Sequence, residues 1–116
     1  MNKRQTGADY EALAARWLQE QGYEILEKNY RCRQGEIDLI ARDGRYLVFI
    51  EVKYRKGSRA GHPAEAVDVR KQRRISRSAA YYCYEHRIPE TQACRFDVIG
   101  ILDGKTEHIK DAFAYI

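Results

Sequence analysis

Two consecutive apolar segments with strong β propensity, residues 35–42 and 45–55, limit the folds open to this chain. The second contains Leu-Val-Phe-Ile followed by Glu-Val-Lys-Tyr, a composition that favours a strand. Asp43 and Gly44 lie between the two segments, and an Asp-Gly pair in that place is a strong signal for a hairpin turn. The sequence therefore predicts two antiparallel strands, and strands this apolar belong in a sheet that is covered on both faces.

Charged side chains interrupt these two apolar strands at Glu36, Asp38, Glu51 and Lys53. Burying unpaired charge is costly, so each of these side chains needs a partner, a metal ion or water. A two-residue turn at Asp43-Gly44 would pair Asp38 with Phe49 across the strands. Because side chains alternate along a strand, all four charged residues would then share one face of the sheet.

Two neighbouring carboxylates on one face repel each other unless a cation lies between them. Asp38 and Glu51 offer hard oxygen ligands, which suit Mg²⁺ or Mn²⁺. Such an ion polarises a phosphoryl oxygen and activates water, and Lys53 would orient that water or stabilise charge on the phosphate. The pattern indicates phosphodiester hydrolysis. The alternative is a structural ion pair, Glu51–Lys53 or Asp38–Lys53, at the edge of a sheet.

The remaining periodicities and turn signals predict a mixed α/β fold in one domain, residues 1–116. The expected elements, in the order α-β-β-β-α-β-β, are a helix over 6–21 capped by Thr6, an edge strand over 23–30, a polar turn at 31–34, the two strands above, a loop at 56–63, a helix from Ala64 or Asp68 to Glu85, a strand over 94–102, a turn at Asp103-Gly104, and a strand or extended tail over 106–113. This order predicts a mixed sheet of about five strands flanked by helices.

Composition narrows the class of protein. The chain has 116 residues and is 44 % hydrophobic, enough for the core of one domain. It contains no apolar run long enough to span a membrane, and its polar N-terminus does not resemble a secretory signal, so we expect a cytoplasmic protein. Three widely spaced cysteines suit free thiols in a reducing compartment, and neither they nor the three histidines have zinc-ligand spacing.

Positive charge is concentrated in the second half of the chain. Residues 53–87 contain ten Lys or Arg and three Asp or Glu, a balance of +7, and the remainder carries −3. Such a segment is a candidate for a phosphate-facing surface, although a solvated helix face would show the same pattern. The charged residues expected to face nucleic acid are Arg55, Arg70, Lys71, Arg73 and Arg74.

The strand pair resembles one particular family. Gly35-Glu36-Ile37-Asp38-Leu39-Ile40-Ala41 with Leu47-Val48-Phe49-Ile50-Glu51-Val52-Lys53-Tyr54-Arg55 is similar to the YraN family of small bacterial proteins. Arg95-Phe96-Asp97-Val98 and the ending His108-Ile109-Lys110-Asp111-Ala112-Phe113 also resemble it. That family is in turn similar to the restriction-endonuclease-like PD-(D/E)xK superfamily, and nearest in pattern to archaeal Holliday junction resolvases.

The resemblance implies roles for individual residues. Asp38 matches the first metal-binding acid, and Glu51 and Lys53 match the second half of the motif, while Ile37 stands where the motif's name has Pro. Gly7 followed by Glu11 matches a helix pattern of the resolvases, which would make Glu11 a further catalytic acid. An ordinary exposed helix glutamate is the alternative for that residue. The resemblance also adds Gln72, which lies in the same stretch as Lys71, to the residues expected to face nucleic acid.

Three functions follow as expectations. The first is a Mg²⁺- or Mn²⁺-dependent endonuclease acting on DNA, in particular branched or repair and recombination intermediates, with a homodimer left open as its oligomeric state. The second is a non-catalytic nucleic-acid-binding protein with a nuclease-like fold. The third is an interaction module whose acidic hairpin binds a protein partner. Positive charge recognises only phosphates, which all nucleic acids share. Branched DNA, nicked DNA, single strands and RNA are therefore all candidate substrates.

Overall fold

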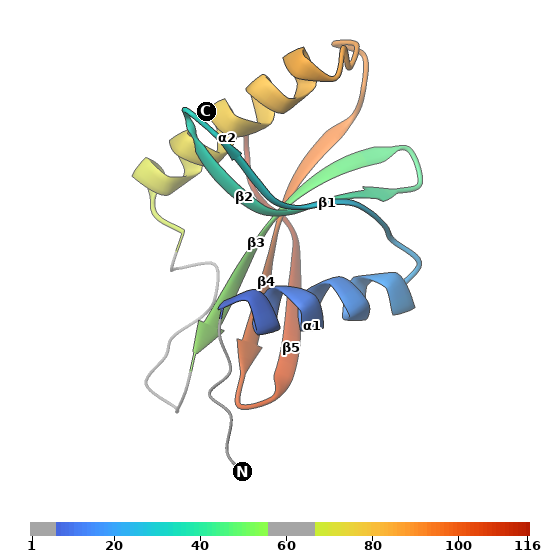
Figure 1. Cartoon of the computed structure of the whole chain (residues 1–116), viewed down its shortest axis with the longest axis vertical. Coiled ribbons are helices and arrows are strands. Elements are labelled where there is room, and N and C mark those ends of the chain that lie inside the picture. The colour runs from blue at the N-terminus through green and yellow to red at the C-terminus, as the bar shows by residue number, and fades with distance from the viewer. Residues whose placement is uncertain (1–6, 56–66) are drawn as a thin grey trace.

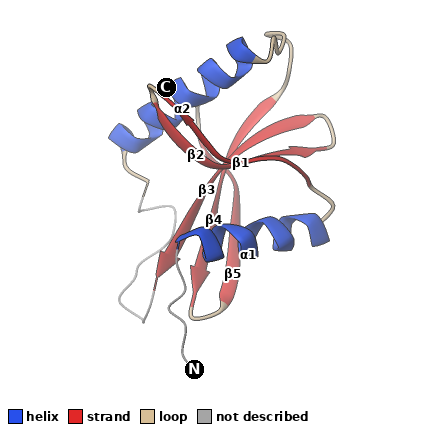
Figure 2. Cartoon of the chain, viewed as in Figure 1, coloured by secondary structure: helices blue, strands red, loops and turns tan. Residues whose placement is uncertain are grey.

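A computed structural model describes residues 7–55 and 67–116 of the chain, without the side chain of Arg55 (Figures 1 and 2). The predicted α-β-β-β-α-β-β order is confirmed. The elements are α1 (Gly7–Glu20), β1 (Glu24–Cys32), β2 (Gly35–Asp43), β3 (Tyr46–Arg55), α2 (Val69–Glu85), β4 (Cys94–Leu102) and β5 (Lys105–Phe113). The predicted Thr6 cap and the loop at 56–63 lie outside the described residues.

The five strands form one mixed sheet in the order β1-β2-β3-β4-β5. β3 and β4 run parallel, with α2 in the connection between them, and the other neighbouring strands run antiparallel. β1 lies at one edge, as predicted, and β5 lies at the other. The central position of β3 explains why its sequence is so apolar, because both of its faces are covered.

The two helices cover opposite faces of the sheet (Figure 1). On one face α1 packs Leu18 against Val48 and Ile50 of β3. On the other face α2 packs Ile75 against Phe49. Alternation along β3 thus divides its apolar residues between two cores, and it places every second residue of the strand toward α2.

The helix α2 begins at the later of the two predicted starts. Asp68 is its N-cap, and the Asp68 side chain accepts a hydrogen bond from the Lys71 backbone N–H at 2.9 Å. This contact satisfies one of the free N–H groups of the first turn. It also fixes the point where the basic part of the helix starts beside the sheet.

The turn between β2 and β3 differs from the prediction. Its two residues are Gly44 and Arg45, and Asp43 pairs with Tyr46 as the last residue of β2. Gly44 has φ +57°, a left-handed conformation that glycine adopts without strain, so the turn starts there. The Asp43 carboxylate accepts a hydrogen bond from Arg95 at 3.1 Å, which holds Asp43 within the sheet.

This change moves the register by two residues, so the paired segment, from Leu39–Ile50 to the turn, keeps its predicted faces. Next to the last pair, Asp38 Oδ2 accepts a hydrogen bond from the Val52 backbone N–H at 2.8 Å.

The prediction that Glu36 shares a face with Glu51 and Lys53 is wrong. Its neighbours Gly35 and Ile37 both face α2, so Glu36 faces the other side of the sheet.

The other differences are small. β1 continues to Cys32, so the polar turn consists of Arg33 and Gln34, and the C-terminal segment is a true strand, paired with β4 through the predicted Asp103-Gly104 turn. All three cysteines are free. Neither described helix is sufficiently long and apolar to cross a membrane.

Candidate functional site

Four charged residues from three elements meet on the α2 face of the sheet. They are Asp38 from β2, Glu51 and Lys53 from β3, and Lys71 from α2. Lys71 Nζ lies 2.8 Å from Glu51 Oε1, and Lys53 Nζ lies 3.6 Å from the same oxygen. The Glu51 side chain is only 7 % exposed, so this carboxylate is held between two ammonium groups inside the protein.

The negative charge of Asp38 is neutralised less completely by its neighbours than that of Glu51. Its Oδ2 accepts a hydrogen bond from the Val52 backbone N–H at 2.8 Å, and the Glu51 carboxyl group lies beside it. Burial and the negative charge of Glu51 raise the pKa of Asp38 to about 7. At neutral pH Asp38 is therefore protonated for part of the time.

The pKa of Lys53 is shifted in the opposite direction to that of Asp38. Burial lowers the pKa of Lys53 from its usual value, and the neighbouring Lys71 ammonium adds to this effect. Burial alone would lower the pKa of Lys71, but its contacts with Glu51 and Lys53 and the charge of Asp38 together outweigh burial and raise it. The two lysines thus differ in character, and Lys53 gives up a proton more readily.

Glu11 on α1 is half-buried and not an ordinary exposed helix residue. Its Oε1 atom is buried and has no hydrogen-bond partner. Burial, followed by the charge of Glu36, raises the pKa of Glu11, and the charge of Glu51 contributes in the same direction. The structure therefore brings a third carboxyl group into the electrostatic environment of the Asp38–Glu51 pair.

The donor set suits a hard divalent cation better than zinc. Among residues 7–55 and 67–116 no cluster of three or more His, Cys, Asp or Glu side chains has the geometry of a complete metal site. Mg²⁺ does not require one, because it retains several waters and commonly uses one or two carboxylates together with substrate phosphates. The neighbouring Asp38 and Glu51 carboxyls fit that mode of binding, and the charge of Glu11 acts on both of them.

A basic cleft opens beside this cluster. It has a volume of about 650 Å³ and lies between the first half of α2 and the β1–β2 turn. Arg31 and Arg33 line one wall, and Arg70 and Arg74 line the other, with Lys71 also at its surface. The close approach of the two walls depends on Gly35, because a Cβ there would lie 3.3 Å from Ser78 Oγ and its φ is +145°.

The residues predicted to face nucleic acid have different environments. Arg70, Arg73 and Arg74 are exposed on α2, whereas Lys71 is turned toward Glu51. Gln72 donates from Nε2 to the Val67 carbonyl at 2.9 Å, a contact inside the protein. The side chain of Arg55, which was also predicted to face nucleic acid, lies outside the described residues.

Sequence reasoning missed two features of the site. It did not include Arg31 and Arg33, although their spacing around the β1–β2 turn places both next to the start of β2. It also did not pair Lys71 with Glu51, because the two residues come from different elements and no local pattern connects them.

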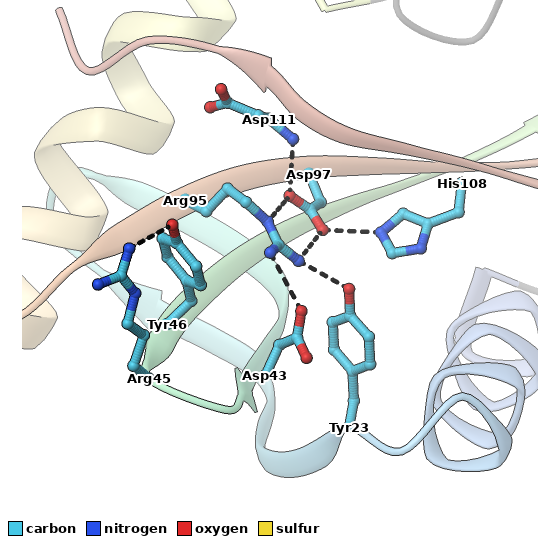
Figure 3. Close-up of polar contacts among 8 residues, drawn as sticks. All are labelled: Tyr23, Asp43, Arg45, Tyr46, Arg95, Asp97, His108 and Asp111. Carbon is cyan, nitrogen blue, oxygen red and sulfur yellow. Dashed lines mark hydrogen bonds and ion pairs between the residues drawn. The ribbon is translucent and has the colours of Figure 1, made fainter.

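A second buried charge cluster lies on the opposite, α1-covered face and is centred on Asp97 of β4 (Figure 3). The Asp97 carboxylate is fully buried and accepts hydrogen bonds from Arg95 at 2.8 and 2.9 Å and from the Asp111 backbone N–H at 3.0 Å. His108 Nε2 lies 2.7 Å from it. Burial alone would raise the pKa of Asp97, but the bonds with His108 and Arg95 outweigh burial and hold it below its usual value.

Comparison with known proteins finds a family described as "Uncharacterised protein family UPF0102", whose model matches residues 10–101. Relatives bearing that description occur in distant bacteria. One from Lachnoclostridium phytofermentans is 52 % identical over 113 residues, covering 97 % of this chain and 96 % of the relative. Another from Rhodococcus opacus is 48 % identical and covers 92 % and 94 % of the two chains.

Proposed function

The chain belongs to the uncharacterised protein family UPF0102, and we propose that it is a divalent-metal-dependent nuclease that hydrolyses phosphodiester bonds in DNA. The observation that carries the proposal is the contact between the Asp38 and Glu51 carboxyl groups, with Lys53 Nζ 3.6 Å from Glu51. Family membership agrees with the predicted YraN resemblance. The relation to PD-(D/E)xK nucleases is part of the proposal.

In this mechanism Asp38 and Glu51 hold Mg²⁺ or Mn²⁺. The bound ion would lower the pKa of a water molecule and polarise a phosphoryl oxygen. Lys53 lies next to Glu51 and would stabilise the charge that develops on the phosphate, or orient the attacking water. Glu11 has a buried oxygen without a partner, so it would accept a hydrogen bond from a water at the same site.

The basic cleft supports a nucleic acid as the substrate. Its arginines would neutralise phosphates on either side of the acids, and guanidinium groups bind phosphate oxygens in pairs. None of the described elements is an isolated helix or ribbon built to enter a DNA groove, so we expect weak sequence preference. Branched DNA and repair intermediates, cut by a symmetric dimer, are the more specific form of this proposal.

One observation favours the rival function, a nucleic-acid-binding protein without catalysis. Glu51 is paired with two lysines and could serve only to join α2 to β3. In that case the cluster would be scaffold, and the cleft alone would carry the function. Removing one member of a buried structural ion pair costs about 3–5 kcal/mol, so stability measurements distinguish the two functions.

The test is a panel of end-labelled single-stranded, duplex, nicked, flapped and four-way branched DNAs, with matching RNAs, incubated with Mg²⁺ or Mn²⁺. Wild type should cut at least one of them, and Asp38→Asn and Lys53→Met should not, although both should melt near wild type. Glu24→Gln on β1 is the matched control, because Glu24 is an exposed strand acid away from the cluster. A wild type that cuts nothing, together with variants that melt far lower, would establish the scaffold function.

A further inference from the structure

The exposed face of α2 carries arginines followed by tyrosines in a single stripe. Its members are Arg70, Arg74, Arg77, Tyr81 and Tyr84, all exposed. Successive members are three or four positions apart, a spacing that aligns side chains along one side of a helix. From the first to the last the stripe covers about 21 Å, at about 1.5 Å of rise per residue.

The two tyrosines differ from the third tyrosine of the same segment. Tyr82 is buried and packs against Tyr30 and Phe49, so it belongs to the core. Tyr81 is 41 % exposed and Tyr84 is 81 % exposed, and their ring centroids lie 6.3 Å apart with planes inclined by 33°. Helical phase therefore sets two adjacent aromatic rings in solvent, where burial of apolar surface does not account for them.

The stripe is continuous with the candidate site. Arg70 and Arg74 also line the basic cleft, and Lys71 from the same helical turn contacts Glu51 at 2.8 Å. The arginines thus lie near the acids, and the tyrosines follow toward the other end of α2. A polymer held along this face would pass from the aromatic pair into the cleft.

We propose that this stripe binds a single-stranded segment of nucleic acid, with its phosphates on Arg70, Arg74 and Arg77 and with unpaired bases stacked on Tyr81 and Tyr84. Positively charged tracks combined with aromatic rings are the usual means of holding single strands without reading sequence. A duplex offers the same phosphates to the arginines, but its base faces are covered by neighbouring base pairs and cannot stack on a side chain.

Charge excludes a second copy of this chain, packed through the same face, as the occupant of the stripe. Glu85 is the only acidic residue within α2, so this face repels an identical face of a second copy. The proposed strand is anionic along its whole length and complements the arginines. As a statement about substrate, the inference rests on the proposed function: the DNA that is cut would have a single-stranded segment beside the cleavage point.

The experiment measures binding by fluorescence anisotropy of a labelled single-stranded oligonucleotide and of its duplex, in EDTA so that nothing is cut. The double variant Tyr81→Ala/Tyr84→Ala should bind the single strand at least about 30-fold more weakly, because two stacked bases are lost, and it should bind the duplex as wild type does. Tyr81→Phe/Tyr84→Phe should bind like wild type, because phenylalanine retains the stacking face. Tyr115→Ala is the matched control, an exposed tyrosine outside α2.

Several results would overturn the proposal. Unchanged single-strand affinity of the double alanine variant would do so, as would equal losses for single strand and duplex. Binding to anionic lipid vesicles with the same tyrosine dependence, but not to oligonucleotides, would assign the stripe to a membrane surface instead. The Phe variants and circular dichroism melts separate loss of stacking from loss of folding.

The same measurements keep this inference distinct from the proposed function. If the protein binds single strands in a tyrosine-dependent way but cuts none of the DNA or RNA panel, the proposed nuclease function is rejected and the proposed role of the stripe is retained. If the double alanine variant instead cuts substrates with and without single-stranded segments at the wild-type rate, in a metal-dependent way, the opposite follows. That result would reject the proposed role of the stripe and retain the proposed nuclease function.

Discussion

Two buried acids on opposite faces of one sheet, Asp38 and Asp97, have opposite electrostatic environments. Asp97 is bonded to a guanidinium, an imidazole and a backbone N–H, so both of its oxygens are satisfied (Figure 3). Asp38 has one backbone donor, and a second carboxyl group, that of Glu51, lies beside it. The pKa of Asp97 is lowered, whereas that of Asp38 is raised to about 7.

The difference separates a structural cluster from a candidate site. The Asp97 cluster links β4 to β5 through His108, and Arg95 extends it to Asp43 of β2 and to Tyr23 before β1. All of its charge is compensated within the protein. The Asp38 cluster contains two neighbouring acids, and the pKa of Asp38 is raised. The cluster lies beside a basic cleft, and a shifted pKa in a cleft is typical of functional sites.

The largest expected effect is on cleavage. Asp38→Asn should reduce metal-dependent cleavage to the assay background while the melting temperature stays near that of wild type, because the proposed ligand is lost and the Val52 bond can be kept. Rates from a labelled DNA substrate, measured beside thermal melts, check this. Wild-type rates in Asp38→Asn would show that the acid pair has no chemical role.

The next largest effect is on stability at the other cluster. Asp97→Asn should lower the free energy of unfolding by about 3–5 kcal/mol, because it leaves the buried Arg95 guanidinium without its main partner. Urea unfolding measures the loss. The double variant Asp97→Asn/Arg95→Met should recover part of it, and losses that simply add would contradict the pairing.

A smaller effect concerns pH, with opposite signs at the two acids. Folded Asp38 keeps its proton up to about pH 7, whereas the unfolded chain releases it near the ordinary value of 3.8, so this group stabilises the fold less as pH rises through that window. The lowered pKa of Asp97 acts the other way, and its contribution is lost only as pH falls below the ordinary carboxyl range.

Without divalent metal, the protein should therefore be more stable near pH 5 than near pH 8, by roughly 2 kcal/mol from Asp38. Urea unfolding in EDTA at both values measures the difference, and Asp38→Asn should reduce it. Mn²⁺ should also reduce it, by stabilising the ionised acids at the higher pH. A difference that persists unchanged in Asp38→Asn would assign it to other groups.

The smallest effect is on the salt dependence of nucleic-acid binding. Arg74→Gln in the cleft should lower the slope of log affinity against log salt by about 0.7–0.9, the contribution of one phosphate contact. Arg16→Gln on the exposed side of α1 is the matched control and should leave the slope unchanged. Equal slopes for both variants and wild type would make α2 an ordinary solvated helix.

Local patterns predicted the order of the elements and the face shared by Glu51 and Lys53, but not the face of Glu36. The alternation of β3 placed Glu51 and Lys53 on one side of the sheet. That prediction stayed correct although the predicted turn was wrong, because the pairing register differed by an even number of residues. The start of α2 was predicted less well, since both Ala64 and Asp68 were acceptable from the sequence. Only the Asp68 cap shows which of them the described helix uses.

Contacts between distant segments could not be predicted in the same way. Arg95 donates to Tyr23 across 72 positions of the chain, and Lys71 reaches Glu51 from another element. Arg31 and Arg33 became part of a cleft only when α2 packed beside their turn. In each case the sequence shows the charge but not its partner, because many opposite charges are available and no short-range rule selects among them.

The sequence by itself determined that Asp38, Glu51 and Lys53 would share a face, because alternation in a strand is a property of the local backbone. Tertiary structure decided which charges are neutralised and which are not. It surrounded Asp97 with donors from β4 and β5, and it left Asp38 beside another carboxyl group. The physical reason is that the ionisation of a buried acid depends on desolvation and on charges a few ångströms away, and both are set by how the helices and strands pack.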